Sequence, residues 1–463
     1  MAISLSALGI PPGLSSLIQT NTLQRKFYDA LFPALLYRAD TTPEMWAANL
    51  GEKMVMTRTG LIPVALQPLI PGSDPVSQAY ATEQWTVEAN QYAGLVNTNM
   101  PSSYVSLASI FLRNTHQLGL QAGQTVNRLA RNKMFVAYDS GEANALGAVG
   151  AGGTAVPVST VDGFTEQIVN GRIEPVSAAN PVRVSFSTPG EPDNFVISAT
   201  PSDPKQPAGL GVLTLSAPLV VGVAARDTVL SENRARRVRA GGGVSVDAIT
   251  AADTLTLQDC ISAVSRMRAQ RVPPHPDGWY HAHITPAGEA QIFQDNAWQR
   301  LFQSLPGATE YREFLVNEQV GIRFYRNTES PTASTVSTVV KTGANALMAP
   351  EIGAEVVNDL GVPIDRMLVT GGGVCYEKWI DEAKYITTAG VTGKIGNFAI
   401  TNNGLMVMTD RIRFIVRAPL DALQQNVTQA WSYSGDWGVP SDQTSGDAAR
   451  FKRAVVVEHA GAL

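Results

Sequence analysis

The residues PSSYVSLASIFLRNTHQLGLQAGQTVNRLARNKMFVAYDSG, from Pro101 to Gly141, decide how the rest of this chain can fold. Apolar side chains recur there at steps of mostly three and four, which places an apolar stripe on one side of a helix. They are Leu107, Phe111, Leu118, Ala122, Val126, Leu129, Met134 and Ala137. A serine after Pro101 can cap the helix start, and Gly141 stands where a helix end is expected. The stretch therefore predicts one helix much longer than average.

The predicted helix is cationic on a chain that is acidic. Between Tyr104 and Tyr138 it carries no acid and four cations, Arg113, Arg128, Arg131 and Lys133, whereas the whole chain has a net charge of −5. A helix of this kind is expected to face something anionic. Gly119 and Gly123 would each weaken it by about 1 kcal/mol relative to alanine, so we expect another segment to pack closely against them.

Composition limits the class of protein. The chain has 463 residues, of which 44% are hydrophobic and 16% charged, so it can bury a large core in two or three domains. Its net charge is too small to predict affinity of the whole chain for nucleic acid or membrane. Cys260 and Cys375 are far apart without metal-type spacing and are expected to be buried thiols in a reducing compartment. With no signal peptide and no apolar run of about 20 residues, a soluble intracellular protein is expected.

Two arms are predicted ahead of the long helix. Residues 1 to about 24 are small and polar, and the aromatic helical pattern that follows must dock on its own core or on a neighbouring chain; its apolar residues are Phe27, Tyr28, Leu31, Phe32, Leu35 and Leu36. Residues 53–58 and 83–90 then alternate like two strands, with Trp85, Val87 and Ala89 on one face. The connection between them contains Pro63, Pro68, Pro71 and Pro75, which cannot join a central sheet. We interpret 52–92 as a projecting β-arm, with an irregular surface loop as the alternative.

The composition changes after the long helix. Residues 143–253 are rich in Gly, Pro, Val, Thr and Ser, with short strands expected at 182–187, 195–200 and 212–216, which suggests an inserted sandwich or barrel. A capping box at Thr256 and Asp259 then begins a helix. Strands are expected at 279–285, 320–326 and 454–457, a helix after Pro286, and a hairpin at Asn403-Gly404. Helices and strands mix without a βαβ rhythm, so the predicted class is α+β.

No catalytic, cofactor or metal site is predicted. Gly150, Gly152 and Ala155 match a dinucleotide-binding pattern, but Val156-Pro157 block the helix that such a site needs. His281 and His283 lie on one strand face near His275, without further ligands to complete a zinc site. Cys375 follows a glycine turn with no base nearby in sequence, and Asp381 and Glu382 are adjacent and so face different ways.

The densest basic run contains Arg234, Arg236, Arg237 and Arg239. It is expected either to touch phosphates or an acidic partner, or, more commonly for such runs, to be an exposed solvated segment. Projecting arms, low charge and an empty list of chemical sites together favour a self-assembling structural protein.

The order of these segments resembles the major capsid protein family of tailed bacteriophages, which has the Hong Kong 97-type fold. The resemblance lies in an arm and a β-arm ahead of a long helix, in Gln91-Tyr92 after the second strand as in podovirus-type coat proteins, and in the strand, proline and helix unit at 279–302. It implies an N-arm at 1–50, an E-loop at 51–95 and a P-domain spine helix at 96–142. An inserted β-rich domain at 143–253, an A domain with P-domain strands at 254–430 and a C-terminal P-domain strand at 431–463 would follow.

The resemblance implies a major capsid protein, not an enzyme, whose hexamers and pentamers assemble in the host cytoplasm into the icosahedral head of the virion. Implied partners are a separate scaffolding protein, a portal, a cement protein and packaged double-stranded DNA bound non-specifically, with no cofactor, metal or membrane. Arg113, Arg128, Arg131 and Lys133 would face the lumen, and Pro63, Pro68, Pro71, Pro75 and Trp85 would lie in E-loop contacts between subunits. The alternatives are an encapsulin-like shell, a phage tail structural protein, or a multidomain enzyme.

Overall fold

The computed structural model describes most of the chain between Asn21 and Gly461. The continuous described stretches are 21–32, 35–47, 51–59, 82–101, 110–161, 163–169, 172–202, 210–232, 237–243, 246–302, 318–329, 362–381, 393–395, 397–401, 404–417, 425–439 and 453–461. The chain divides into two units. The first contains 1–54, 86–131 and 376–438, and the second 55–85, 132–375 and 439–463. Both helices and sheets are present, as the α+β class predicts.

The first unit is built on one sheet with the strand order β1-β20-β25-β24-β23-β22-β21, in which β4 also pairs with β25. The strands are β1 (Thr42–Met45), β4 (Asn90–Asn99), β20 (Tyr376–Trp379), β21 (Gly393–Ile395), β22 (Phe398–Thr401), β23 (Gly404–Thr409), β24 (Ile412–Arg417) and β25 (Asn426–Gly438). β4 and β25 pair over ten residues. No strand is predicted from the sequence over 90–99, and 96–142 is predicted as one helical region.

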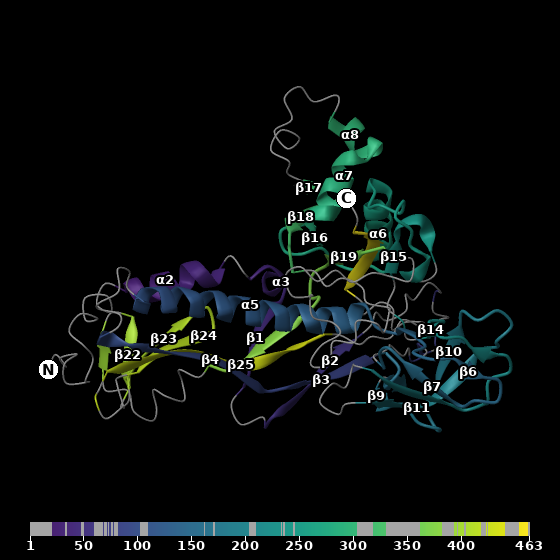
Figure 1. Cartoon of the computed structure of the whole chain (residues 1–463), viewed down its shortest axis with the longest axis horizontal. Helices are drawn as coiled ribbons and strands as arrows, with labels where there is room; N and C mark the ends of the chain where they lie inside the picture. The colour runs from purple at the N-terminus through teal and green to yellow at the C-terminus, as the bar shows by residue number, and fades with distance from the viewer. Residues whose placement is uncertain are drawn as a thin grey trace. The chain divides into compact units, whose positions relative to one another are not determined.

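The predicted long helix is confirmed as α5 (Ile110–Tyr138), 29 residues long, while residues 102–109 of the prediction lie outside the described part. It lies along the sheet (Figure 1) and buries most of the expected stripe, including Phe111, Leu118, Ala122, Val126 and Met134. Leu129, expected in that stripe, is only half-buried. Polar contacts also fix the helix, because the Gln429 amide of β25 donates to Thr115 Oγ1 at 2.8 Å.

Small residues allow this close packing. Gly94 of β4 lies opposite Trp431 of β25, and a Cβ at Gly94 would lie 2.5 Å from the indole nitrogen of Trp431. That nitrogen donates to Gln121 Oε1 of α5 at 3.2 Å. The glycine therefore makes the space in which a buried tryptophan joins the sheet to the helix.

The aromatic segment after the N-terminal arm docks on its own core, which decides between the two predicted possibilities. Helix α2 (Thr22–Leu31) lies beside α5 on the same side of the sheet (Figure 1) and buries Leu23, Phe27 and Leu31. The Phe27 ring stacks on Phe414 of β24, with ring centres 4.7 Å apart. A Cβ at Gly119 of α5 would lie 2.6 Å from the Phe27 carbonyl oxygen, so the close packing expected at this glycine is observed. A short helix, α3 (Leu36–Ala39), follows.

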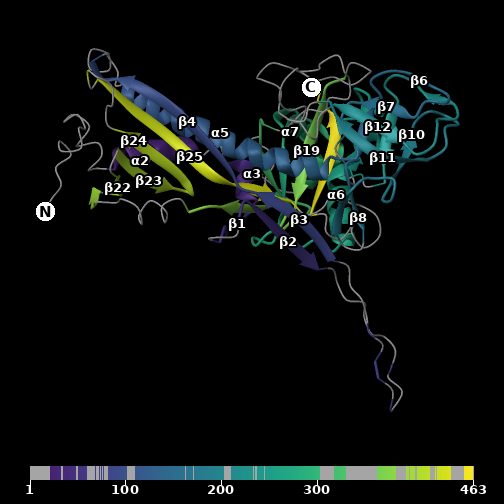
Figure 2. The ribbon, with the colours of Figure 1, turned by 90° about the horizontal axis from the view of Figure 1, so that it is seen from below.

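The predicted β-arm strands are present as β2 (Lys53–Thr59) and β3 (Thr82–Glu88). Among the described residues they pair only with each other (Figure 2). Trp85 and Val87 are buried, as expected for one face of the second strand, and Ala89 is half-buried.

Residues 142–231 of the second unit form a closed antiparallel barrel with the order β5-β14-β10-β11-β12-β7. The strands are β5 (Glu142–Asn144), β7 (Ala155–Val158), β10 (Val182–Phe186), β11 (Asn194–Pro201), β12 (Gly211–Leu215) and β14 (Thr228–Ser231). The first and last strands meet through the bridge Ala145↔Val158 and a hydrogen bond from Ser159 N to Asn144 O at 2.9 Å. The sequence left a sandwich and a barrel open as alternatives, and the structure shows a barrel. Val156, Val196 and Leu213 are fully buried in its core.

Four short strands accompany the barrel as two separate pairs. One pair is β6 (Val149–Gly150) with β13 (Gly222–Val223), and the other is β8 (Glu166–Val169) with β9 (Arg172–Pro175). The chain leaves this region through two short 3-10 helices, η3 (Ala240–Gly242) and η4 (Val246–Ala248).

The other sheet of the second unit has the order β15-β26-β19-β16-β18-β17. Its strands are β15 (Arg237–Arg239), β16 (Tyr280–Ile284), β17 (Glu318–Gln319), β18 (Ile322–Arg326), β19 (Ile364–Thr370) and β26 (Ala454–Ala460). Helices α6 (Leu257–Ala269), α7 (Pro286–Gln294) and α8 (Asn296–Phe302) belong to this unit. Thr256 and Asp259 form the predicted capping box of α6, and Thr285 caps α7.

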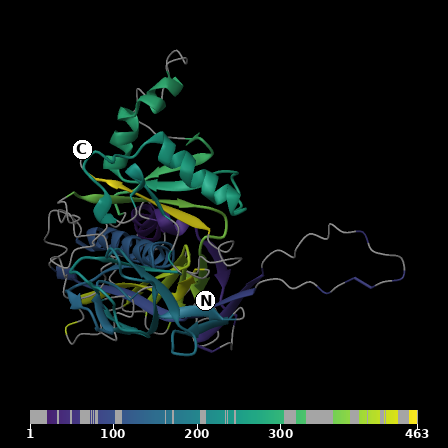
Figure 3. The ribbon, with the colours of Figure 1, turned by 90° about the vertical axis from the view of Figure 1, so that its right-hand side faces the viewer.

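Three predictions for the second half of the chain need correction. The single helix expected after Pro286 is two helices, because Asp295 adopts an extended conformation between them. Gly404, predicted in a hairpin turn with Asn403, is instead the first residue of β23 and pairs with Thr401, while Asn403 lies outside the described residues. The last strand, β26, lies between β15 and β19 of this second sheet (yellow among green strands in Figure 3). The prediction of a C-terminal P-domain strand at 431–463 had placed it in the sheet beside the long helix.

Within the described residues, no helix is long and apolar enough to cross a membrane.

Replacing Gly119 with alanine should destabilise the protein. In an ordinary helix this change adds about 1 kcal/mol of stability, but here the new Cβ would lie 2.6 Å from Phe27 O and 2.9 Å from Ala30 Cβ. We expect a net loss of about 1–3 kcal/mol, measured by thermal unfolding. Gln124→Ala, at an exposed position of the same helix, should change stability by less than about 0.5 kcal/mol. A higher melting temperature for Gly119→Ala would contradict the packing described.

Candidate assembly surfaces and buried charge clusters

The cationic face of α5 is smaller than the sequence indicated. Arg113 is exposed and Arg128 is half-buried, and exposed Gln117 and Gln124 lie between them at helical spacing on the same side. Arg131 is fully buried, so it is not available at the surface. Lys133 is exposed but does not continue this row. The row on α5 is therefore two arginines separated by uncharged glutamines.

The β2–β3 pair of the β-arm has one exposed face and one buried face, because Trp85 and Val87 are buried. Val55 of β2 is 58% exposed, and the two strands are linked by an exposed ion pair between Lys53 and Glu88. Of the four prolines in the connection, Pro68 and Pro75 are exposed, whereas Pro63 and Pro71 lie outside the described residues. Trp85, expected in contacts between subunits, is buried within its own chain, so only the exposed face of the pair, which carries Val55, is left for a further surface.

The basic run at 234–239 contains the arginines of a buried ionic cluster, which neither interpretation of the sequence predicted. Arg237 and Arg239 of β15 have side chains that are 6% and 9% exposed. Arg237 Nε lies 2.9 Å from Asp139 Oδ1, and Arg239 Nε lies 2.7 Å from Glu458 Oε2. Arg234 is exposed, as expected for a solvated run, and Arg236 lies outside the described residues. Arg237 and Arg239 therefore form ion pairs inside the second unit.

The complete cluster contains three guanidinium groups and three carboxylates. Arg366 of β19 pairs with Asp139 and with Glu458, and Glu142 of β5 pairs with Arg237 and Arg239. Asp139 directly follows α5, Glu142 begins the barrel, and Arg237 and Arg239 lie on the strand after it. Charges in equal number compensate one another, which a buried cluster requires. The cluster joins the entry and the exit of the barrel to the strands β19 and β26.

Two carboxylates of this cluster, Asp139 and Glu458, have very different pKa values. Burial raises the pKa of Asp139 to about 6, helped by Glu458 and Glu142 and opposed by Arg237 and Arg366. Burial acts in the same direction on Glu458, but its three arginine neighbours outweigh it and lower that pKa to about 2. As the pH falls, Asp139 is therefore protonated before Glu458.

A second buried cluster anchors the segment after α2 within the first unit. Arg38 of α3 donates to Glu377 of β20, with Nη2 and Oε1 2.7 Å apart, and pairs with Asp410 at 2.9 Å. Glu377 also accepts from Tyr433 at 3.0 Å and pairs with Arg411 at 2.8 Å. Removing one partner of a buried ion pair leaves an uncompensated charge. This cluster therefore fixes α3 to its own sheet.

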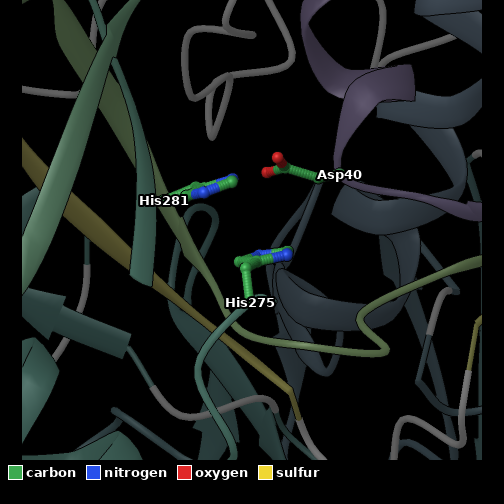
Figure 4. A group of neighbouring side chains, drawn as sticks. All are labelled: Asp40, His275 and His281. Atoms are coloured by element: carbon green, nitrogen blue, oxygen red, sulfur yellow. The ribbon is translucent and has the colours of Figure 1, made fainter. Parts of the chain in front are cut away.

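The histidines noted in the sequence take part in local packing. His283 is fully buried with Nδ1 3.4 Å from the Asn327 amide, and the rings of His275 and His281 stack with centres 4.0 Å apart. Figure 4 shows these two rings; Asp40, also labelled there, belongs to the other unit. His275 Nε2 lies 3.1 Å from Thr370 Oγ1, and His281 Nε2 lies 2.8 Å from Asp277 Oδ2. We assign no metal site to the pair.

The other candidate residues are structural. Both cysteines are buried, and burial raises the pKa of the Cys260 thiol to about 12, which makes it a poor nucleophile. Gly150 ends the short strand β6, and Ala155 begins strand β7 of the barrel. No helix follows these glycines, so the dinucleotide pattern lacks its anion site. Asp381 follows β20, while Glu382 lies outside the described residues.

No protein-family model matches this sequence, and a search of curated proteins finds no match. The solved structures to which the chain is similar include phage capsids. The capsid of Ralstonia phage GP4 matches at 12% identity over 91% of this chain and 87% of that one, with a TM-score of 0.45. The capsid of Cyanophage P-SCSP1u matches at 12% identity over 91% of this chain and 87% of that one, with a TM-score of 0.44. The head of Helicobacter pylori bacteriophage KHP40 matches at 8% identity over 90% of this chain and 87% of that one, with a TM-score of 0.42. All three TM-scores are below 0.5.

The raised pKa of Asp139 predicts a specific pH dependence. Its folded value of about 6 exceeds the ordinary 3.8, so the folded state binds the proton more tightly than the unfolded state. Its contribution to the free energy of unfolding is therefore lost as the pH rises from about 4 to about 6. We expect the stability of the wild type to fall relative to that of Asp139→Asn across this range, measured by urea unfolding at each pH.

The matched control is Asp193→Asn, which removes a carboxylate from the exposed pair with Arg183 and should cost less than about 1 kcal/mol. If the stability difference between the wild type and Asp139→Asn were constant from pH 4 to pH 6, or changed in the opposite direction, the assignment of this proton to Asp139 would be wrong.

Proposed function

We propose that this chain is the major capsid protein of a tailed bacteriophage, which assembles into the icosahedral head around the double-stranded DNA genome. In this proposal the β2–β3 arm is the E-loop, α5 is the spine helix of the P domain, and the β16–β19 sheet with its helices is the A domain. The barrel is an inserted domain. The protein is structural and carries out no reaction.

The observation that carries the proposal is an isolated hairpin, β2–β3, that precedes a 29-residue helix lying on a sheet. The two strands pair with no third strand in the described part of the chain, and Val55 is 58% exposed. The exposed face of this hairpin, which carries Val55, gains contacts when it packs on a neighbouring copy. In a closed shell every copy both provides and receives this contact, so modest contacts add to a high avidity.

Removing the connection between β2 and β3 should prevent assembly without unfolding the subunit. In the test variant the dipeptide Asn-Gly replaces residues 60–81. This two-residue turn links Thr59 to Thr82, and both strands are kept. We expect the wild type to form closed particles and the variant to remain small, with similar circular dichroism and melting temperature. Particle size is measured by electron microscopy and sedimentation velocity.

A matched control replaces 203–209, the connection between β11 and β12, with the same dipeptide and should still assemble. Equal assembly of both variants would remove the proposed role of the arm. A wild-type chain that stays monomeric at high concentration would overturn the proposed function itself. Particles filled with a protein cargo would indicate an encapsulin-like shell, and tubes or rings a tail protein.

The arginine row on α5 should retain packaged DNA. Arg113 and Arg128 lie on one side of the helix and offer two positive charges to phosphates, and in the proposed head this side faces the lumen. Arg113→Gln/Arg128→Gln should reduce the DNA that particles retain after a salt wash, with little effect on particle yield. Arg183→Gln/Arg417→Gln removes two exposed charges elsewhere and should retain DNA normally. Equal loss of DNA and of particle yield in the α5 variant would count against this role.

A further inference from the structure

The outer edge of β4 is a long strand edge to which no partner is assigned. β4 pairs with β25 from Asn90↔Gly435 to Asn99↔Asn426, ten residues without a shift in register. On its other side, no strand pairs with it in the described part of the chain (Figure 2). Half of the backbone donors and acceptors of an edge strand point away from its sheet, so this edge can accept another strand.

This edge also lacks the usual protection against pairing. Natural edge strands carry charged residues, prolines or bulges that keep other strands away. The sequence from Asn90 to Asn99, NQYAGLVNTN, contains no charged residue and no proline. Its continuous register with β25 shows no bulge. A ten-residue edge of this kind is therefore suited to pairing with a strand of another molecule.

The two faces of β4 differ, which limits how a partner strand can align. Toward α5, Thr98 is buried and its hydroxyl accepts from the Asn114 amide at 2.9 Å, and Gly94 lies against Gln121 and Trp431. On the opposite face Ala93 and Asn97 are exposed, and Leu95 is 62% exposed. Residues directly opposite in an antiparallel pair point to the same face of the sheet. An added strand must therefore place its exposed-face residues opposite those of β4.

We propose that β4 pairs antiparallel with β4 of a second copy of this chain, about a two-fold axis through Leu95. An axis perpendicular to the sheet keeps both faces continuous and makes the contact isologous. Leu95 then lies opposite Leu95 of the second copy, Ala93 opposite Asn97, and Gln91 opposite Asn99. The pairing joins the sheets of the two subunits along their edges.

Charge and shape favour a second copy as the occupant. Because the strand is neutral throughout, no like charges meet in the self-pairing, which is the usual obstacle to two identical strands lying side by side. The axis through Leu95 also buries the large apolar side chain that β4 exposes most against its own equivalent. The inference adds to the proposed shell function a contact that the projecting arm does not make.

Cysteine crosslinking tests the register directly. Residues directly opposite in a strand pair have Cα atoms about 4.5–5.5 Å apart, within the range that a disulfide spans. Leu95→Cys should therefore give a disulfide-linked dimer after mild oxidation of assembled particles, seen on a non-reducing gel. The native Cys260 and Cys375 are buried and can remain in place.

Asn97→Cys is the matched control on the same face, because Asn97 would be about 13 Å from its equivalent and should not crosslink. Assembled particles in which Leu95→Cys gives no dimer, or in which both variants crosslink equally, would overturn the pairing while leaving the proposed shell function intact.

A charge at the axis gives an independent test. Leu95→Lys places two ammonium groups opposite each other and should weaken self-association at least ~10-fold by mass photometry. Val220→Lys, at a 64% exposed apolar position of the second unit, should leave self-association unchanged. Circular dichroism checks that both variants fold. Normal association of Leu95→Lys would also overturn the proposal, whereas failure of the wild type to associate at all would instead refute the shell function.

Discussion

The packing of one long helix against one long strand pair determines the arrangement of the first unit. α5 buries a stripe of apolar residues, and β4 and β25 pair over ten residues. Trp431 fills the space left by Gly94 and donates to Gln121. Close packing excludes larger side chains, which explains Gly94 at this crossing and Gly119 of α5 where the helix packs against Phe27 of α2.

Buried charges fix the connections that apolar packing alone would leave undetermined. Arg38 with Glu377 joins α3 to the sheet of the first unit, and three arginines with three carboxylates surround the entry and exit of the barrel in the second. Replacing such ionic groups with apolar ones can be neutral for stability, whereas removing one partner is costly. We infer that these clusters specify one arrangement of the chain more than they add to its stability.

The proposed assembly function depends on features that a single subunit leaves incomplete. The β2–β3 arm has no third strand, and β4 has an uncharged outer edge in the described residues. Either feature would favour aggregation in a protein that acts as a monomer. In a shell each becomes a contact between copies, so the same surfaces that make the isolated subunit prone to association give the assembled particle its stability.

Local patterns in the sequence were sufficient to predict the long helix, the capping box at Thr256, the two strands of the arm and three strands of the barrel, because each is determined by neighbouring residues. The strand at 90–99 was missed because its neutral residues show no alternation of apolar and polar side chains, and its partner β25 lies over 300 residues away along the chain. The interior position of Arg131, Arg237 and Arg239 was not predictable either. Arg237 and Arg239 are buried because carboxylates from distant segments, Asp139 and Glu458, are brought beside them, and only the tertiary structure decides that.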